Sequence, residues 1–472
     1  MAVTPSEAVD PLQFFREHPE ECAYRTLTPP QRIAGMLGLV ALAVLLWRWP
    51  AATLLGLNGA AIVFYVAHSL YKLWLIWISM SRPVALQFTP EEVAKLPDAQ
   101  LPTYTILVPL YREALVLPRL VEHLSKLDYP PDKLDIQLLM EEDDHTTQEA
   151  CAALRLPPQF RAVVVPDSQP KTKPKACNHG LYTSRSDLLV IYDAEDRPEP
   201  DQLRKAVAAF AALPPQVACL QAKLNFYNQR RNLLTRWFTS EYSAWFDLFL
   251  PGLTACGWPI PLGGTSNHFR VPVLQELGGW DPFNVTEDCD LGIRLHKKGY
   301  LATMIDSTTW EEANGNFLSW FRQRSRWVKG YIQTWLVHMR QPLALMRQLG
   351  TGAFSSFHMT IGGAVVSFLL NPVYWLMTLL WFLTRSGLIA SLFPAPIYAL
   401  GVFCLLVANF VFVYVAVIGC LNRGYYDLVK YAVLTPLYWL MMSWGAYKAL
   451  AQLITRPHYW EKTDHGMLGG AS

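Results

Sequence analysis

Long blocks of apolar residues flank a charged central region, and they constrain this chain more than any other feature. A helix needs about 20 apolar residues to cross a bilayer, and four blocks come close to that length or exceed it. Only 17% of the residues are charged, against about 25% in an average soluble domain. Part of the chain is therefore predicted to lie in a membrane. The four blocks and a fifth, interrupted one are residues 33–47, 51–80, 357–383, 397–420 and 431–454.

The first two blocks are predicted to form a transmembrane hairpin, since Arg48-Trp49-Pro50 leaves room only for a tight turn. Arg32, Lys72 and Arg82 favour the cytosol for both of its ends, because cytoplasmic flanks are rich in Lys and Arg. A buried helical pair of a soluble domain is the alternative. If 431–454 also spans, the C-terminal tail ends outside the cell. If this block lies in the membrane interface, the tail stays with the catalytic domain.

The region between the blocks has the pattern of one α/β domain. Short apolar runs of strand length alternate with helical stretches, which is typical of a mainly parallel sheet covered by helices. About 250 residues suffice for such a domain. The predicted parts are a cytosolic arm, the hairpin, this domain, a set of transmembrane or interfacial helices and a cytosolic tail. Their bounds are 1–31, 32–81, 82–340, 341–455 and 456–472.

Three properties of the composition exclude other classes. A net charge of +2 is too small to indicate a nucleic-acid partner. The eight cysteines have no metal-binding spacing, and they are predicted to be reduced and structural. The N-terminal stretch contains several acidic residues, so it does not resemble a cleavable signal peptide.

An acidic loop, Tyr192-Asp193-Ala194-Glu195-Asp196-Arg197, follows the apolar run 187–191. Open α/β sheets bind ligands at the carboxyl ends of their strands. A hard divalent cation prefers oxygen ligands, and a bound diphosphate would complete its shell. Asp193, Glu195 and Asp196 are therefore candidate metal ligands. The alternative is a solvated turn with a helix cap.

Two motifs follow in order: Thr286-Glu287-Asp288 and, 35 residues after Asp288, the set Gln323, Arg326 and Trp327. An acidic strand end, TED and QxxRW in this order resemble the membrane-embedded family 2 glycosyltransferases, which include cellulose, chitin and hyaluronan synthases. The likeness covers about residues 100–335 and the flanking membrane segments. It implies a GT-A fold, Rossmann-like with a mainly parallel sheet, as a cytosolic domain embedded in transmembrane helices.

The resemblance implies an inverting sugar transfer with Mg²⁺ or Mn²⁺ as cofactor. Asp193 resembles the first Asp of the metal-binding DxD motif, and either Glu195 or Asp196 stands for the second. Asp288 is the candidate general base with Glu287 beside it. If the two are buried together, repulsion and desolvation would raise a carboxylate pKa toward the working pH. A helix N-cap is the alternative role for Asp288.

Gln323, Arg326 and Trp327 are implied to contact the diphosphate and the acceptor sugar. The alternating Trp and Arg residues around them are also typical of a helix at a membrane surface, and both interpretations can hold. Asp193 is also a candidate nucleotide-binding residue. Pro109, Tyr111 and Glu113 resemble a PxYNE motif, with Arg112 in place of its Asn. Asp143 of an acidic pair and Lys175 of a basic segment are the remaining candidates.

The C-terminal tail contains Lys462 and Thr463, which loosely resemble the gating segment of cellulose synthases. A gating role would require the tail to lie on the cytosolic side. An unstructured terminus is the alternative.

The predicted function is processive β-glycosyl transfer from a UDP-sugar, most plausibly UDP-glucose, to a growing polysaccharide that the enzyme helps to export. The alternative is transfer of one sugar to a lipid such as a polyprenyl phosphate or a diacylglycerol. A degenerate scaffold subunit and a bare transporter are less favoured. The predicted location is the bacterial inner membrane, and any regulatory or periplasmic export subunit is expected to be another chain.

Overall fold

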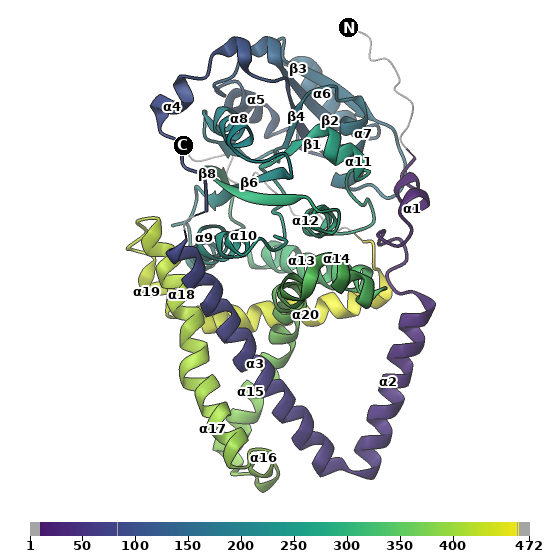
Figure 1. Cartoon of the computed structure of the whole chain (residues 1–472), viewed down its shortest axis with the longest axis vertical. Helices are drawn as coiled ribbons and strands as arrows, with labels where there is room; N and C mark the ends of the chain where they lie inside the picture. Colours follow the sequence, from purple (N-terminus) through teal and green to yellow (C-terminus); the bar gives the residue numbers. More distant parts are fainter. Residues whose placement is uncertain (1–9, 83, 460, 462–472) are drawn as a thin grey trace.

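A computed structural model describes residues 10–82, 84–459 and 461 of the chain. Its upper part, in Figure 1, is built on one eight-stranded sheet of order β3-β2-β1-β4-β7-β6-β8-β5. β1 pairs in parallel with β2 and β4, and β6 pairs in parallel with β8. β7 lies antiparallel between β4 and β6. The predicted, mainly parallel α/β sheet is confirmed.

The strands are β1 Tyr104–Leu110, β2 Leu134–Glu141, β3 Phe160–Val165, β4 Leu188–Ile191, β5 Arg197–Pro198, β6 Val217–Phe226, β7 Asn267–Arg270 and β8 Leu301–Glu311. The helices of this part are α1 Gln13–Glu17, α4 Pro90–Ala94, α5 Leu117–Leu124, α6 His145–Ala153, α7 Lys173–Thr183, α8 Gln202–Ala212, α9 Leu233–Ala244, α10 Leu250–Ala255, α11 Val271–Glu276, α12 Glu287–Lys297, α13 Phe317–His338 and α14 Pro342–Phe357.

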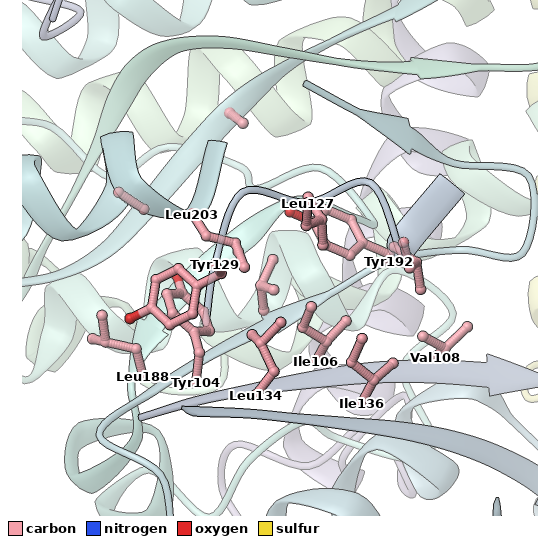
Figure 2. Close-up of a cluster of buried hydrophobic side chains, with 14 of the residues drawn as sticks. Tyr104, Ile106, Val108, Leu127, Tyr129, Leu134, Ile136, Leu188, Tyr192 and Leu203 are labelled. Carbon is pink, nitrogen blue, oxygen red and sulfur yellow. The ribbon is translucent and has the colours of Figure 1, made fainter. Parts of the chain in front are cut away.

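The sheet is buried on both faces. Along β1, Tyr104, Ile106 and Val108 enter a core with side chains of α5 and α8, part of which is drawn in Figure 2. Leu107 points the other way, into a core with α7, α10 and α12. Successive strand residues face opposite sides, so a continuous apolar run is what a sheet covered on both faces requires.

The carboxyl ends of β1, β2 and β4 share one edge of the sheet. β1 lies between β2 and β4, so the chain changes direction across the sheet at β1. Such a switch point leaves a crevice at the strand ends, where open α/β sheets bind ligands. The acidic loop follows β4 directly at this edge.

Four helical segments, two of which contain a short π-helical stretch, are long and apolar enough to cross a membrane. Three of them converge below the sheet in Figure 1, whereas α2 leaves the bundle and has no buried residue. α20 runs across this bundle instead of along it. The membrane-domain helices are α2 Pro29–Arg48, α3 Pro50–Ser81, α15 Gly363–Thr384, α16 Gly387–Ser391, α17 Ala395–Phe403, α18 Asn409–Asn422, α19 Val429–Ala432 and α20 Thr435–Thr455.

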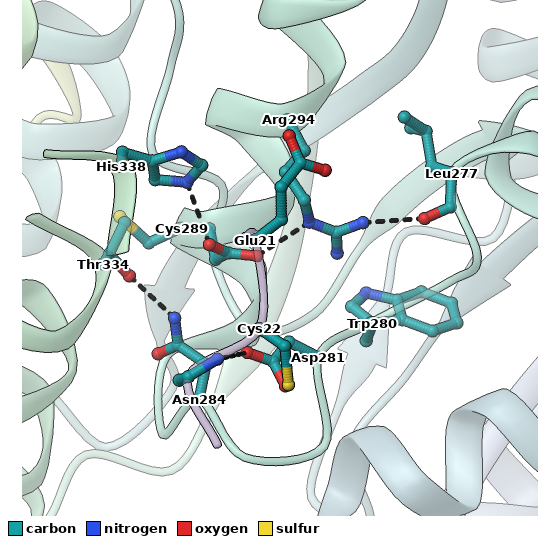
Figure 3. A network of polar contacts seen from close by, with 12 residues as sticks. Glu21, Cys22, Leu277, Trp280, Asp281, Asn284, Cys289, Arg294, Thr334 and His338 are labelled. Atoms are coloured by element: carbon teal, nitrogen blue, oxygen red, sulfur yellow. Dashed lines mark hydrogen bonds and ion pairs between the residues drawn. The ribbon is translucent and has the colours of Figure 1, made fainter. Parts of the chain in front are cut away.

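The N-terminal arm before α2 is anchored on α12 through a buried polar network (Figure 3). Asp290 of α12 accepts hydrogen bonds from Arg294 Nε at 2.8 Å and pairs with His338 Nε2 at 3.0 Å, and all three side chains have no exposed surface. The nearby Asp281 carboxylate accepts a hydrogen bond from the arm, from Cys22 Sγ at 3.2 Å. The network fixes α12 against the arm and α13.

Candidate active site

One cavity of about 580 Å³ lies at the carboxyl edge of the sheet and continues between the membrane helices. It gathers residues from distant parts of the chain, on β1, the acidic loop, α12 and α13. The sequence-predicted residues that line it are Pro109, Tyr111, Glu113, Asp193, Glu195, Glu287, Asp288, Gln323, Arg326 and Trp327. Of the other predicted residues that the structure describes, Asp143, Lys175 and Asp196 do not line it.

Glu287 and Asp288 occupy the first turn of α12 and face the cavity. Burial and the neighbouring Asp288 raise the pKa of Glu287 to about 8, and burial raises that of Asp288 to about 6. Glu287 is buried and Asp288 is half-buried beside it, so the condition predicted from the sequence is met in part. Burial and repulsion between the two groups mean that one of them ionises at a lower pH than the other. A charged carboxylate in this position can accept a proton from a hydroxyl.

The TED turn is held in place by α13. Gly330 of α13 lies so close to Thr286 that a side chain at position 330 would collide with it. This glycine allows the helix that carries Gln323, Arg326 and Trp327 to pass directly over the TED turn.

Lys173, at the start of α7, connects the acidic loop to the TED turn. Its Nζ donates to Asp193 Oδ1, and also to the Gly264 carbonyl oxygen at 2.7 Å. A Cβ at Gly264 would lie 3.4 Å from Asp288 Oδ2 and 3.8 Å from Lys173 Nζ. Asp193 and Asp288 thus border the same small space, with one amine between them.

Within the acidic loop, Asp196 is buried below the cavity. Its Oδ2 accepts from the Asp193 N–H at 2.8 Å and from Thr265 Oγ1, so this side chain shapes the turn. Glu195 lines the cavity instead. Glu311, at the end of β8, also faces this space. Burial and the carboxylates of the loop raise the pKa of Glu311 well above its usual range.

The charge of this cluster fits a divalent cation. Asp193, Glu195, Asp196 and Glu311 interact electrostatically, and Asp196 Oδ1 is buried without a hydrogen-bond partner. In the described part of the chain, no three acidic, His or Cys side chains form a ready-made metal cage. Of these carboxylates, Asp193 and Glu195 line the cavity and could supply part of a coordination shell, which a diphosphate and water would complete.

The QxxRW residues lie on the cavity wall formed by α13. Trp327 stacks on Tyr242 of α9, with ring centroids 6.2 Å apart and planes at 27°. Arg324 lies over the Trp327 ring at 4.5 Å and pairs with Glu241. Both aromatic side chains line the cavity, where they could pack against a sugar ring.

The nucleotide-side candidates separate into two groups. Lys175 is buried and donates to Glu141 Oε2 at 2.6 Å, so it supports the end of β2. Asp143 is exposed and pairs with Lys171 at 2.6 Å. The cavity-facing lysine that contacts the acidic loop is Lys173, which belongs to the same predicted basic segment as Lys175.

The turn after β1 requires an unusual backbone at Arg112, whose φ is +58°. Its N–H donates to the Asp144 carboxylate, which also caps α6. Asn adopts this conformation more readily than Arg, which gives a physical reason for the Asn of the PxYNE motif. The turn keeps Tyr111 and Glu113 on the cavity wall.

Lys462 and Thr463 lie outside the described residues. The segment just before them returns to α13, where Lys329 Nζ donates to the Tyr459 carbonyl at 2.7 Å and Gln333 donates to that of Pro457 at 2.9 Å. Glu461 pairs with Lys448 of α20 at 2.8 Å.

The fold has a solved counterpart in the mannosyltransferase PcManGT from Pyrobaculum calidifontis, determined in complex with GDP-Man and Mn²⁺. The TM-score is 0.54 at 18% identity, with 85% of this chain and 99% of that chain covered. This similarity and the mostly parallel sheet define a GT-A fold, joined here to apolar helices.

Two family descriptions then match the sequence itself. Residues 188–418 match "Glycosyl transferase family group 2", and residues 105–270 match "Glycosyl transferase family 2". Residues 105–418 of the chain are therefore covered by glycosyltransferase family 2 domain matches.

Named relatives fall into several groups. The probable glycosyltransferase YdaM of Bacillus subtilis is 26% identical over 53% of this chain and 60% of its own length. The beta-monoglucosyldiacylglycerol synthase of Synechocystis sp. is 26% identical over 66% of this chain and 68% of its own. A probable glucomannan 4-beta-mannosyltransferase of Arabidopsis thaliana is 27% identical over 51% of this chain and 45% of its own. The chain thus spans less than two thirds of the length of YdaM and of the Arabidopsis mannosyltransferase. The named glycosyltransferases among the relatives confirm the prediction of a hexosyltransferase.

Proposed function

We propose that this enzyme transfers one hexose, with inversion, from a UDP-sugar to a hydroxyl group of a membrane lipid. UDP-glucose is the most plausible donor. The observation that carries the proposal is the single cavity that joins Asp193 and Asp288 to the apolar helices. A water-soluble acceptor would not need a cavity that extends from the catalytic carboxylates into the membrane helices.

The depth of the cavity favours a lipid over an exported polymer. Its lining includes Tyr65, His68, Lys72 and Ile76 of α3 but no residue of that helix before Tyr65. Beyond the cavity, polar contacts link the helices, since Asn58 Nδ2 donates to the Leu392 carbonyl at 2.7 Å and Tyr374 donates to Asn58 Oδ1 at 2.8 Å. A chamber that ends part-way along the helices has room for a lipid headgroup that enters from one leaflet, whereas an exported polymer would need a path along their full length.

The proposed mechanism assigns each step to residues of the cavity. Asp288 accepts the proton of the acceptor hydroxyl, whose oxygen attacks the anomeric carbon on the face opposite the leaving group. The bond from that carbon to the diphosphate breaks, and UDP leaves with the electron pair. Lys173 and Arg326 bind the diphosphate, and Trp327 orients the acceptor.

Asp193 and Glu195 are proposed to hold a divalent cation, Mg²⁺ or Mn²⁺. Such an ion would neutralise charge on the departing diphosphate. Asp196 is assigned to shaping the turn, because its side chain lies beneath the cavity.

Processive synthesis of a polysaccharide is the second candidate. The stacked Trp327 and Tyr242 rings support it, because they could bind successive sugars of a chain. The glucomannan mannosyltransferases among the relatives support it as well. In either case we propose that the catalytic domain faces the cytosol at a bacterial inner membrane.

The test is to incubate purified enzyme in nanodiscs with radiolabelled UDP-glucose, Mg²⁺ and an extract of bacterial membrane lipids. We expect label in the organic phase as a glycolipid that carries one hexose. An ethanol-insoluble polymer would instead establish the second candidate. The Asp288→Asn variant serves as the inactive control.

A further inference from the structure

The membrane half of the cavity contains charged and polar side chains that the proposed chemistry does not use. We name it the inner chamber and define it by Tyr65, His68, Lys72, Ser367, Asn371 and Phe412. It lies between α3, α15 and α18. Ionisable residues at membrane depth are costly, and they commonly mark a functional site.

Lys72 is the cation of this chamber. It lies nine residues before the end of α3, about 14 Å along the helix axis. Its Nζ lies 4.6 Å from the centre of the Phe412 ring and 6.0 Å from that of Phe249. No acidic side chain among the described residues forms a salt bridge with Lys72.

The carboxylate that could neutralise Lys72 is already occupied. Glu241 lines the same cavity, but Arg324 donates to both of its oxygens, to Oε1 at 3.0 Å. Tyr438 Oη donates to Glu241 as well, at 2.6 Å. Glu241 and Arg324 therefore balance each other, and the positive charge of Lys72 remains in excess.

Two further groups of the chamber have unused hydrogen-bonding capacity. Both ring nitrogens of His68 are without a partner although its side chain has no exposed surface. Ser367 Oγ is buried and also lacks a partner. α15 passes His68 closely, since a Cβ at Gly363 would lie 2.8 Å from His68 Nδ1. Burying polar groups without partners costs free energy, and a ligand that bonds to them would remove that cost.

We infer that the inner chamber binds the phosphate of the acceptor lipid, with Lys72 as the cation and His68 and Ser367 as hydrogen-bond partners. An excess positive charge in an apolar chamber selects an anion over a neutral headgroup. The chamber opens toward Asp288 at one end, so a hydroxyl of the same headgroup can reach the base. The inference rests on the proposed lipid acceptor and adds that this lipid is anionic.

Binding of defined lipids to the full-length enzyme tests this inference by native mass spectrometry in detergent. The probes are dioleoyl phosphatidic acid, dioleoylglycerol with the same acyl chains, undecaprenyl phosphate and inorganic phosphate. We expect the wild type to retain phosphatidic acid at least about tenfold better than dioleoylglycerol, a difference of about 1.4 kcal/mol. Comparing the retention of undecaprenyl phosphate with that of phosphatidic acid identifies which kind of lipid phosphate the enzyme prefers.

Three variants separate charge from packing. Lys72→Met should reduce the preference for phosphatidic acid to about twofold or less, whereas Lys72→Arg should keep most of it. Lys430→Met removes a lysine of α19, outside the chamber, and should leave the preference unchanged. Each variant is checked for thermal stability and for UDP binding, so that a folding defect is recognised.

Equal retention of the two dioleoyl lipids by the wild type would overturn the inference, and so would a Lys72→Met variant that loses both lipids equally. Inorganic phosphate bound as tightly as the lipids would also overturn it. The assay needs no turnover, so its result is independent of hexose transfer. A glycolipid product without any preference for phosphate would refute the inference and leave the proposed function standing.

Discussion

At the scale of single residues, the site depends on two adjacent carboxylates that are ionised to different extents. Asp288 has its pKa raised to about 6 and Glu287 to about 8, each chiefly by burial. Two neighbouring acids with separated pKa values are a common way to obtain one base and one neutral group at the same pH.

The first prediction follows from these values. Since Asp288 must be ionised to accept a proton, the transfer rate should fall about tenfold for each pH unit below about 6. Glu287→Gln should keep this acidic limb, because Glu287 is already neutral there. Asp288→Asn should lower kcat by about 100-fold or more and change UDP affinity by less than about twofold.

Rates measured between pH 4.5 and 8 check this prediction. Asp132→Asn, a change at an exposed position in the same domain, is the matched control. Loss of the acidic limb in Glu287→Gln would assign the base to Glu287 instead of Asp288.

Lys173 and Lys175 illustrate how much of the site can be predicted from sequence. The basic segment itself was recognised. Lys173 and Lys175 are two positions apart on one helix, so their side chains point about 200° apart around its axis. Lys173 faces the cavity, so Lys175 faces the core, where it neutralises Glu141. Sequence alone does not reveal the rotation of the helix about its axis.

At the scale of elements, local patterns predicted much more. The apolar runs at β1, β2, β3 and β4 and the turns after them were recognisable because strand, turn and motif are adjacent in the chain. Glu311 and Tyr242 were missed, since each approaches the site from another element and belongs to no motif. Only the sheet order and the packing of α9 bring them to the cavity.

α12 gives a prediction at this scale, because a buried ion pair fixes its position. Arg294→Met would leave the Asp290 carboxylate buried with His338 as its remaining partner. Breaking a buried pair from one side costs about 3–5 kcal/mol, so we expect a large loss of thermal stability. Arg161→Met, which breaks an exposed pair with Asp135, should cost less than about 1 kcal/mol.

Thermal unfolding of the two variants, followed in the same detergent, provides the comparison. Equal melting temperatures for Arg294→Met and Arg161→Met would show that the network does not hold α12 in place.

At the scale of the whole molecule, we predict that the four long apolar segments cross the membrane and that α20 does not, which gives an even number of passes. The described part of the tail also contacts the N-terminal arm, where His458 Nε2 lies 3.1 Å from the Tyr24 carbonyl oxygen. α20, within block 431–454, lies across the bundle and is not among the described helices apolar enough to span a membrane, which favours an interfacial position for this block.

Reporter fusions check this topology. Fusions at either end of the chain should report the same side of the membrane, and a fusion after Ser391 in α16 should report the other side. Opposite signals from the two ends would mean that α20 spans the bilayer.

The limited depth of the chamber has a consequence for traffic across the membrane. A chamber whose lining ends part-way along the helices would return its product to the leaflet from which the substrate came. The sugar-bearing lipid would then stay on the side where nucleotide sugars are made. Its passage to the other leaflet would be the work of a separate flippase, and the two events could be regulated independently.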